Sequence, residues 1–235
     1  MNREDEIIIL LKQILLKLSS NSHLFDPLLT GLATLVAAFL GAWFAFKFQR
    51  DKEKELEINR NVMNGNSAIF NIMRMITTLR NVQTQIIDPT RNRHDRFLVM
   101  LPTNNFNADE IKLNIDSLYF LLETDERNIL GEVVIEETRF RSALQSINDR
   151  SRIHLKDAQP LLEKAGIVEG GDYTLEDIKK ALGERLCRTL QRATEEMISS
   201  VDETIVSMKT VADKLKTSLK KIYPDKKIIG FEIIK

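Results

Sequence analysis

An uninterrupted apolar stretch near the amino terminus constrains this chain more than any other feature. From Leu28 to Phe46 the sequence reads LLTGLATLVAAFLGAWFAF, nineteen residues without a charged side chain. At about 1.5 Å per helical residue, this stretch is long enough to cross the roughly 30 Å hydrocarbon core of a bilayer. A buried helix of a soluble domain is rarely so uniformly apolar. We therefore predict a transmembrane helix over residues 27–48.

Cationic side chains are distributed unevenly on the two sides of this stretch. Only three precede it, whereas four follow it closely: Lys47, Arg50, Lys52 and Lys54. Because positive charge favours the cytoplasmic side, we predict a single-pass protein of the cell inner membrane with a cytoplasmic carboxyl-terminal region. The same four cations and Trp43 are the predicted contacts with lipid headgroups.

A cleaved secretory signal is the alternative interpretation of the apolar stretch. The stretch is longer than a usual signal core, and a long arm precedes it. A small-x-small cleavage pattern does not occur before the basic residues. These features favour a helix that stays uncleaved in the membrane.

Small residues recur at every fourth position of the predicted transmembrane helix, at Ala33, Ala37, Gly41 and Ala45. This spacing places them along one stripe, where two backbones can approach closely. The pattern predicts contact between copies of this helix and therefore a homo-oligomer, although alanines that simply face lipid would look the same. One copy offers no ionisable lining for an ion pathway.

The arm over residues 1–26 contains a second apolar segment, IIILLKQILLKL, which begins at Ile7. It is too short to span a bilayer, but its spacing is typical of an amphipathic helix. Such a helix needs a cover for its apolar surface. Packing on the membrane surface and self-association both fit.

The region 49–223 is predicted to be an all-α bundle, because the chain holds only nine Gly and five Pro and is rich in helix-forming residues. A helix continuous with the membrane segment is expected to bend at Asn64–Gly65 and to end at Asp88–Pro89. The other expected boundaries are a helix from Asn107 to Leu122, a helix capped by Thr124, a short helix at Pro160 and a break at Gly170–Gly171.

The strongest helical pattern begins at Thr174, which has the spacing of a capping box with Asp177. Apolar residues then recur every three or four positions until Pro224, which predicts one helix approaching 50 residues. Such a helix suits either an intramolecular bundle or an intermolecular coiled coil. The weak apolar seam at Ala193–Thr194 favours the bundle.

The tail over residues 224–235 ends in KKIIGFEIIK and carries much apolar surface. Two arrangements would cover that surface. The tail could fold back as an edge strand beside Phe97–Leu101, forming a small pair of strands, or it could bind another protein. Ile229, Phe231 and Ile233 are the predicted partner contacts in the second case.

The common catalytic signatures, including the P-loop, HExxH, GxSxG and paired CxxC motifs, are absent from the sequence. The three histidines are isolated, so neither a metal nor another cofactor is expected. Cys187 is the only cysteine, which excludes an intrachain disulfide and suggests a buried, inert thiol. The sequence therefore gives no sign of an enzyme, although an unrecognised helical active site with converging polar groups would escape such a search.

The charges balance, with 34 basic and 34 acidic residues, so nucleic acid is not expected as a direct ligand. The densest cation cluster beyond the membrane flank holds Arg91, Arg93 and Arg96, with His94 between them. These arginines are the predicted contacts for phosphate groups. A solvated loop is the alternative.

Three segments, GAWFAFKFQRDKEKE, LLEKAGI and the helix containing ALGERL, resemble uncharacterised bacterial membrane proteins with one anchor and a cytoplasmic helical region. Some membrane proteins of this plan look like effectors of antiphage systems, including retron-associated effectors. The resemblance implies an effector or signalling component that self-associates and perturbs the membrane under the control of a protein partner. The alternative is a membrane-tethered scaffold that recruits a cytoplasmic protein.

Overall fold

The computed structural model describes residues 22–167 and 171–230, together with Ile9, Lys12, Gln13 and Leu16. Every regular element within these residues is a helix, so the chain is all-α, as predicted. The small pair of strands does not form in the part described. The described residues of the arm, which are Ile9, Lys12, Gln13, Leu16 and residues 22–26, are helical, and most of the arm lies outside the described residues.

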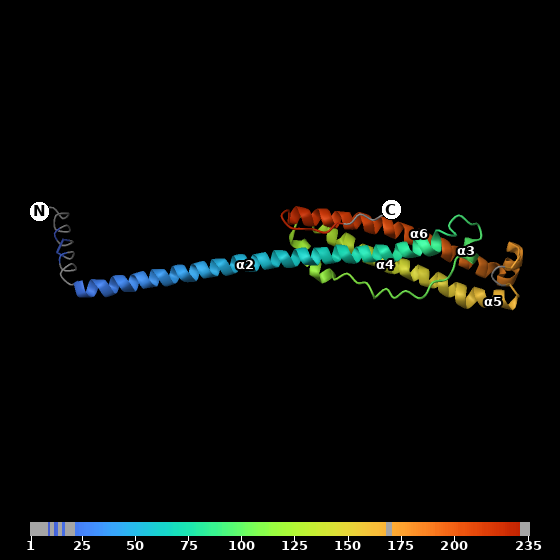
Figure 1. The fold of residues 1–235 in the computed structure, drawn as a ribbon, viewed down its shortest axis with the longest axis horizontal. Coiled ribbons are helices and arrows are strands. Elements are labelled where there is room, and N and C mark those ends of the chain that lie inside the picture. Colours follow the sequence, from blue (N-terminus) through green and yellow to red (C-terminus); the bar gives the residue numbers. More distant parts are fainter. Residues whose placement is uncertain (1–8, 10–11, 14–15, 17–21, 168–170, 231–235) are drawn as a thin grey trace. The chain divides into compact units, whose positions relative to one another are not determined.

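The chain divides into two compact units, residues 1–57 and 58–235, and we describe each by itself. Helix α2, Ser22–Val82, contributes to both units (Figure 1). Its apolar part is the one stretch among the described residues that is long and apolar enough to cross a membrane. A candidate membrane helix near the amino terminus is thus present, as the sequence predicts.

The second unit is a helical bundle, in which the later part of α2 packs beside α4, Asn128–Arg152, and α6, Leu175–Ile222 (Figure 1). Each helix contributes apolar residues at three-and-four spacing, which places them on the face that meets the other helices. Fully buried members of this core include Ile69, Ile72, Leu79, Val133, Ile147, Val201, Met208 and Leu215. The seam of α6 is therefore covered within the chain, as the predicted bundle requires.

Helix α2 continues through Asn64–Gly65, so the predicted bend at this position is wrong. Gly65 instead gives room for α6: a Cβ atom built on Gly65 would lie 2.5 Å from Cδ1 of Leu219. The helix passes into a π-helical turn, η1, Gln83–Ile87. Regular structure then ends at Asp88, as predicted from the following proline.

Helix α6 begins with the predicted capping box. The Thr174 hydroxyl accepts from the Asp177 N–H at 3.2 Å, and the Asp177 carboxylate accepts from the Thr174 N–H at 3.0 Å. The single uninterrupted helix is a wrong prediction, because Gly183 has φ +72° and ψ 153° and separates residues 175–182 from the longer remainder. Only glycine adopts this backbone conformation readily.

A second, smaller core lies where α6, on both sides of Gly183, meets α3, Arg96–Val99, and the π-helical turn η3, Ile153–Ala158. The short helix α5, Gln159–Lys164, follows η3 and has Pro160 in its first turn, as predicted. It ends before Gly166, whose φ is +72°, so the chain leaves the helix earlier than the predicted break. The buried members of this core are Phe97, Ala158, Leu182, Cys187 and Leu190.

The predicted helix from Asn107 to Leu122 is wrong over its first half. Residues 101–114 form a loop along α4, and only the 3-10 helix η2, Ile115–Glu123, follows, with Asn114 at its N-cap. Polar side chains of α4 hold this loop. The Asn148 amide both donates to and accepts from the Phe106 backbone, each at 2.8 Å, and the Ser151 hydroxyl accepts from the Thr103 N–H at 3.0 Å.

Thr124 ends η2 rather than capping the next helix. Its N–H donates to the carbonyl of Leu121, and α4 begins four residues later at Asn128. A threonine hydroxyl can stabilise either end of such a turn, because it also accepts from the backbone two residues on, here from Glu126. The sequence alone therefore left the helix boundary ambiguous.

Candidate functional site

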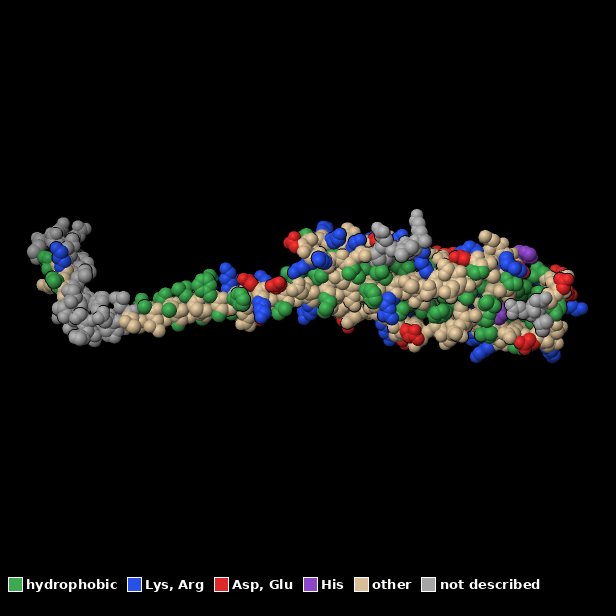
Figure 2. Space-filling model, in the orientation of Figure 1, with side chains coloured by type: hydrophobic (Ala, Val, Ile, Leu, Met, Phe, Trp, Pro, Cys, Tyr) green, Lys and Arg blue, Asp and Glu red, His purple; other side chains and the backbone are tan. Residues whose placement is uncertain are grey.

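The apolar segment of α2 is exposed along its whole described length. Every residue from Thr30 to Gln49 is exposed, and Leu35 keeps 73% of its surface. Figure 2 shows hydrophobic side chains gathering along this segment, with Lys and Arg appearing where it ends. Such a patch is far larger than soluble proteins usually expose. A bilayer or other helices would remove it from water.

The predicted helix contacts lie together on this exposed surface. Ala33, Ala37, Gly41 and Ala45 are all exposed. A Cβ atom built on Gly41 would meet no other atom within 4 Å. The stripe is thus not used for packing within the described chain, and larger side chains there would meet no internal obstacle.

The predicted headgroup contacts lie at the end of the same segment. The Lys47 ammonium lies 5.8 Å from the centre of the Trp43 ring, and Phe44 contacts that ring edge-on at 5.3 Å. Arg50, Lys52 and Lys54 follow on exposed turns of α2. An aromatic ring beside a cation suits the boundary between acyl chains and headgroups.

Each arginine of the predicted anion site meets a carboxylate of this chain. The Arg91 guanidinium donates to Asp202 at 2.6 Å and to Asp88 at 2.9 Å, and Arg93 donates to Asp95. The hydrogen bond from Arg91 holds the pKa of Asp202 below its ordinary value. A phosphate would compete with these carboxylates, so anion binding stays a prediction.

Arg96 forms the third of these pairs, with Glu195 of α6. It also donates to the backbone carbonyl of Arg91. The pairs with Asp202 and Glu195 attach the loop after α2 to α6. These guanidinium groups therefore have a structural part in the bundle.

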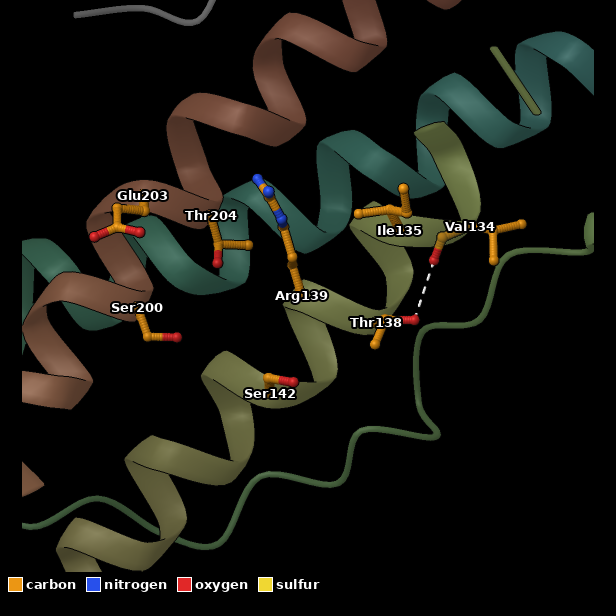
Figure 3. A pocket seen from close by; sticks show the side chains of 8 residues that line it. All are labelled: Val134, Ile135, Thr138, Arg139, Ser142, Ser200, Glu203 and Thr204. Carbon is orange, nitrogen blue, oxygen red and sulfur yellow. Dashed lines mark hydrogen bonds between the residues drawn. The ribbon is translucent and has the colours of Figure 1, made fainter. Parts of the chain in front are cut away.

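A groove of about 370 Å³ lies between α4 and α6 (Figure 3). The Arg139 guanidinium donates to Ser207 at 2.6 Å, and the Ser207 hydroxyl donates to the buried Glu136 carboxylate. Ser142 and Ser200 line the groove, and neither His nor Lys is among the other lining residues to act as a base toward a serine hydroxyl. The hydrogen bonds of Arg139, Ser207 and Glu136 join the two helices.

Arg150 is the largest fully buried side chain among the described residues, with 1% of its surface exposed. Its Nη2 donates to the carbonyls of Phe97 and Met100, which holds the end of α3. The Nε and Nη1 groups have no partner within the described chain. Burial lowers the pKa of Arg150 to about 10, so the group stays charged near neutral pH.

His154 follows Arg150 by one helical turn and is half-buried. Burial, and then the positive charge of Arg150, lower the pKa of His154 from 6.5 to about 4. The folded chain therefore keeps this imidazole neutral near pH 6, whereas the unfolded chain would begin to protonate it. Protons bind the unfolded state more strongly, so acid destabilises the fold through this residue.

We expect the free energy of unfolding to be about 1–2 kcal/mol lower at pH 5 than at pH 7.5 because of His154. This contribution is complete above pH 6.5 and is lost as the pH falls toward about 4. Urea unfolding of the detergent-solubilised protein at the two pH values measures it. His154→Asn should flatten the difference, and His94→Asn, at an exposed position, should retain it. An unchanged difference in His154→Asn would assign it to other groups.

Cys187 lines a second hollow of about 880 Å³, together with His94 and Phe97. The thiol is buried, as predicted, and burial raises its pKa, which keeps it protonated and unreactive. Among the described residues, no group of three His, Cys, Asp or Glu side chains is arranged to hold a metal ion.

The described part of the tail lies on α2 and not beside Phe97–Leu101, so the edge-strand prediction is wrong for residues 227–230. The Asn66 amide donates to the Lys227 carbonyl at 3.1 Å and accepts from the Ile229 N–H at 3.0 Å. The other two predicted partner contacts, Phe231 and Ile233, lie outside the described residues.

Sequence reasoning missed Asn66 and Asn148, which hold extended segments, and Arg150, which holds the end of α3. Their signal in the sequence is weak, because a single polar residue on a helix usually faces solvent. An asparagine amide has both a donor and an acceptor, so it can replace one rung of a β ladder. The segments that Asn66 and Asn148 bind are also distant from them in the sequence.

Comparisons with protein-family models, with curated proteins and with solved structures found no match to this chain.

Proposed function

We propose that this chain is a non-enzymatic, single-pass effector of the bacterial inner membrane, which self-associates through its membrane helix and thereby alters membrane integrity. The observation that carries the proposal is the exposed stripe of small residues on an exposed apolar helix. Such a stripe allows close contact between helices.

The charge distribution supports a cytoplasmic bundle. The cations from Lys47 to Lys54 follow the apolar segment directly, and such flanking charge favours retention on the cytoplasmic side. In this orientation the bundle is available to a cytoplasmic partner that would control assembly of the membrane helices. The resemblance to retron-associated effectors makes antiphage defence the proposed setting.

Replacing Ala37 and Gly41 with Ile should abolish membrane depolarisation on controlled expression while leaving membrane abundance unchanged. The β-branched side chains would separate the two backbones, and the structure offers no internal clash that would disturb folding instead. A voltage-sensitive dye in living cells measures the potential.

The matched control is Leu35→Ile with Phe39→Ile, two exposed positions on the opposite side of the same helix. This control should depolarise cells as the intact protein does. Depolarisation by the Ala37→Ile, Gly41→Ile variant would reject the stripe as the contact. If neither the variants nor the intact protein depolarises the membrane, an effector that acts without a partner is rejected.

A membrane-tethered scaffold is the second candidate, favoured by two exposed apolar side chains on η2. Tyr119 and Leu122 keep 51% and 52% of their surface, while the neighbouring Leu118 and Leu121 are fully buried. An exposed aromatic and aliphatic pair is typical of a protein contact. In that case Tyr119→Ser with Leu122→Ser should remove partner capture, and the stripe variant should retain it.

A further inference from the structure

The first segment of α6, residues 175–182, is joined to the longer remainder of the helix through Gly183, at one end of the bundle (Figure 1). Gly183 has φ +72° and ψ 153°, a backbone conformation that is costly for any residue except glycine. A Cβ atom built there would meet no other atom within 4 Å, so packing does not exclude a larger residue. The backbone conformation alone therefore requires glycine at this joint between two helical pieces.

Few contacts hold the first segment on the bundle. Leu182 is its one buried side chain, while Leu175 and Ile178 are half-buried and pack against the smaller core. Its side-chain hydrogen bonds and ion pairs to described residues all stay between Thr174 and Lys179. Polar bonds thus stabilise the segment internally, and within the described chain its side chains hold it on its neighbours by apolar contact alone.

The hollow of about 880 Å³ lies at the joint between the two pieces of α6. The first segment lines it with Leu175 and Lys179, the remainder of α6 lines it with Cys187 and Gln191, and α3 contributes Phe97. Side chains do not fill this space as they fill a closely packed core. The first segment is therefore in contact with its neighbours over only part of its inner face.

The main core does not depend on the first segment. The buried residues of α6 in the main core begin at Met197, whereas those in the smaller core are Leu182, Cys187 and Leu190. The two clusters of buried residues are separate. Loss of the contacts of the first segment therefore leaves the main core intact, which is the condition for opening one part of a protein without unfolding the whole.

We propose that residues 175–182 form a flap that rotates about Gly183 and opens while the main bundle stays folded. Opening exposes side chains of the smaller core, among them Phe97 and Cys187. The flap is thus a conformational switch at one end of the bundle, and its open form presents an apolar surface that the closed form covers.

Cys187 can report the opening, because it is the only cysteine of the chain and keeps 6% of its surface exposed. Methyl methanethiosulfonate should modify it only in the open form, and mass spectrometry of the detergent-solubilised, full-length protein follows the reaction. We expect a rate that is nearly independent of urea below the unfolding transition, because opening a flap exposes little surface. A rate that rises with urea with the slope of global unfolding would overturn the proposal.

Gly183→Ala should speed the modification of Cys187 about tenfold or more, because the closed flap requires a backbone conformation that alanine disfavours. Gly131→Ala is the matched control, since Gly131 is an exposed glycine of α4 with no atom within 4 Å of a built Cβ. The control should leave the rate unchanged. Circular dichroism and the urea midpoint verify that the main bundle stays folded in both variants. Equal rates in Gly183→Ala and the intact protein would overturn the hinge.

Val133→Ala separates flap opening from global unfolding. Val133 is fully buried in the main core, so its truncation lowers the free energy of unfolding. Modification through the flap should stay within about twofold of the rate in the intact protein, because the flap does not contact this part of the core. A rate that increases in proportion to the lost stability would show that the reagent reaches Cys187 by global unfolding, and would overturn the proposal. These outcomes do not depend on membrane depolarisation.

Discussion

Phe140→Ala is expected to lower the free energy of unfolding by about 3–5 kcal/mol. Phe140 lies in the middle of α4 with 1% of its surface exposed, and it packs within the core that joins α2, α4 and α6. Truncation removes a whole ring and leaves a cavity that three helices cannot easily close. The total free energy of unfolding of a domain is about 5–15 kcal/mol, so a large part of the stability depends on this side chain.

Urea unfolding of the detergent-solubilised protein, followed by circular dichroism, measures the effect of Phe140→Ala. Ile135→Ala is the matched control, because Ile135 lies on the same helix and keeps 53% of its surface exposed. It should change the free energy by less than about 1 kcal/mol. A loss in Phe140→Ala no larger than that of the control would contradict the bundle core.

The sequence predicts well those helices whose ends are set by residues that are neighbours in the sequence. Thr174 and Asp177 form the start of α6 from neighbouring residues, and Pro89 limits the preceding helix through its effect on Asp88. The apolar seam of α6 is equally local, because its period sets its buried face. Such signals need no knowledge of the remaining chain.

The loop over residues 101–114 could not be predicted because its partners come from elsewhere. Asn148 and Ser151 supply the hydrogen bonds that Phe106 and Thr103 would otherwise make within a helix. Gly183 is similar, because a glycine inside a periodic pattern is usually tolerated as helix. Gly183 follows Leu182, which is buried in the smaller core.

The spacing of the candidate membrane contacts is a local signal of the same kind as the apolar seam of α6, and the contacts themselves stay a prediction. Spacing along one helix places Ala37 beside Gly41 whatever the fold of the bundle. The ion pairs of Arg91 and Arg96 are not a local signal, because Asp202 and Glu195 are more than 90 residues away in the sequence. The sequence shows the cations but does not show which carboxylates neutralise them.

Gly65→Val is expected to lower the free energy of unfolding by about 2–3 kcal/mol through overpacking. Even a Cβ atom at this position would lie 2.5 Å from the Leu219 side chain, which is itself fully buried. Valine adds two further methyl groups between α2 and α6. Either Leu219 must leave its rotamer or the two helices must separate.

Gly131→Val separates this packing effect from the general preferences of a helix. Gly131 lies on α4, is exposed, and has no atom within 4 Å of a built Cβ. The same substitution there should change the free energy of unfolding by less than about 0.5 kcal/mol, since valine is a slightly better helix former than glycine. Equal effects at the two glycines in urea unfolding would mean that α2 and α6 do not approach closely at Gly65. A loss confined to Gly65→Val would show that this glycine is required for contact between helices and not for a bend.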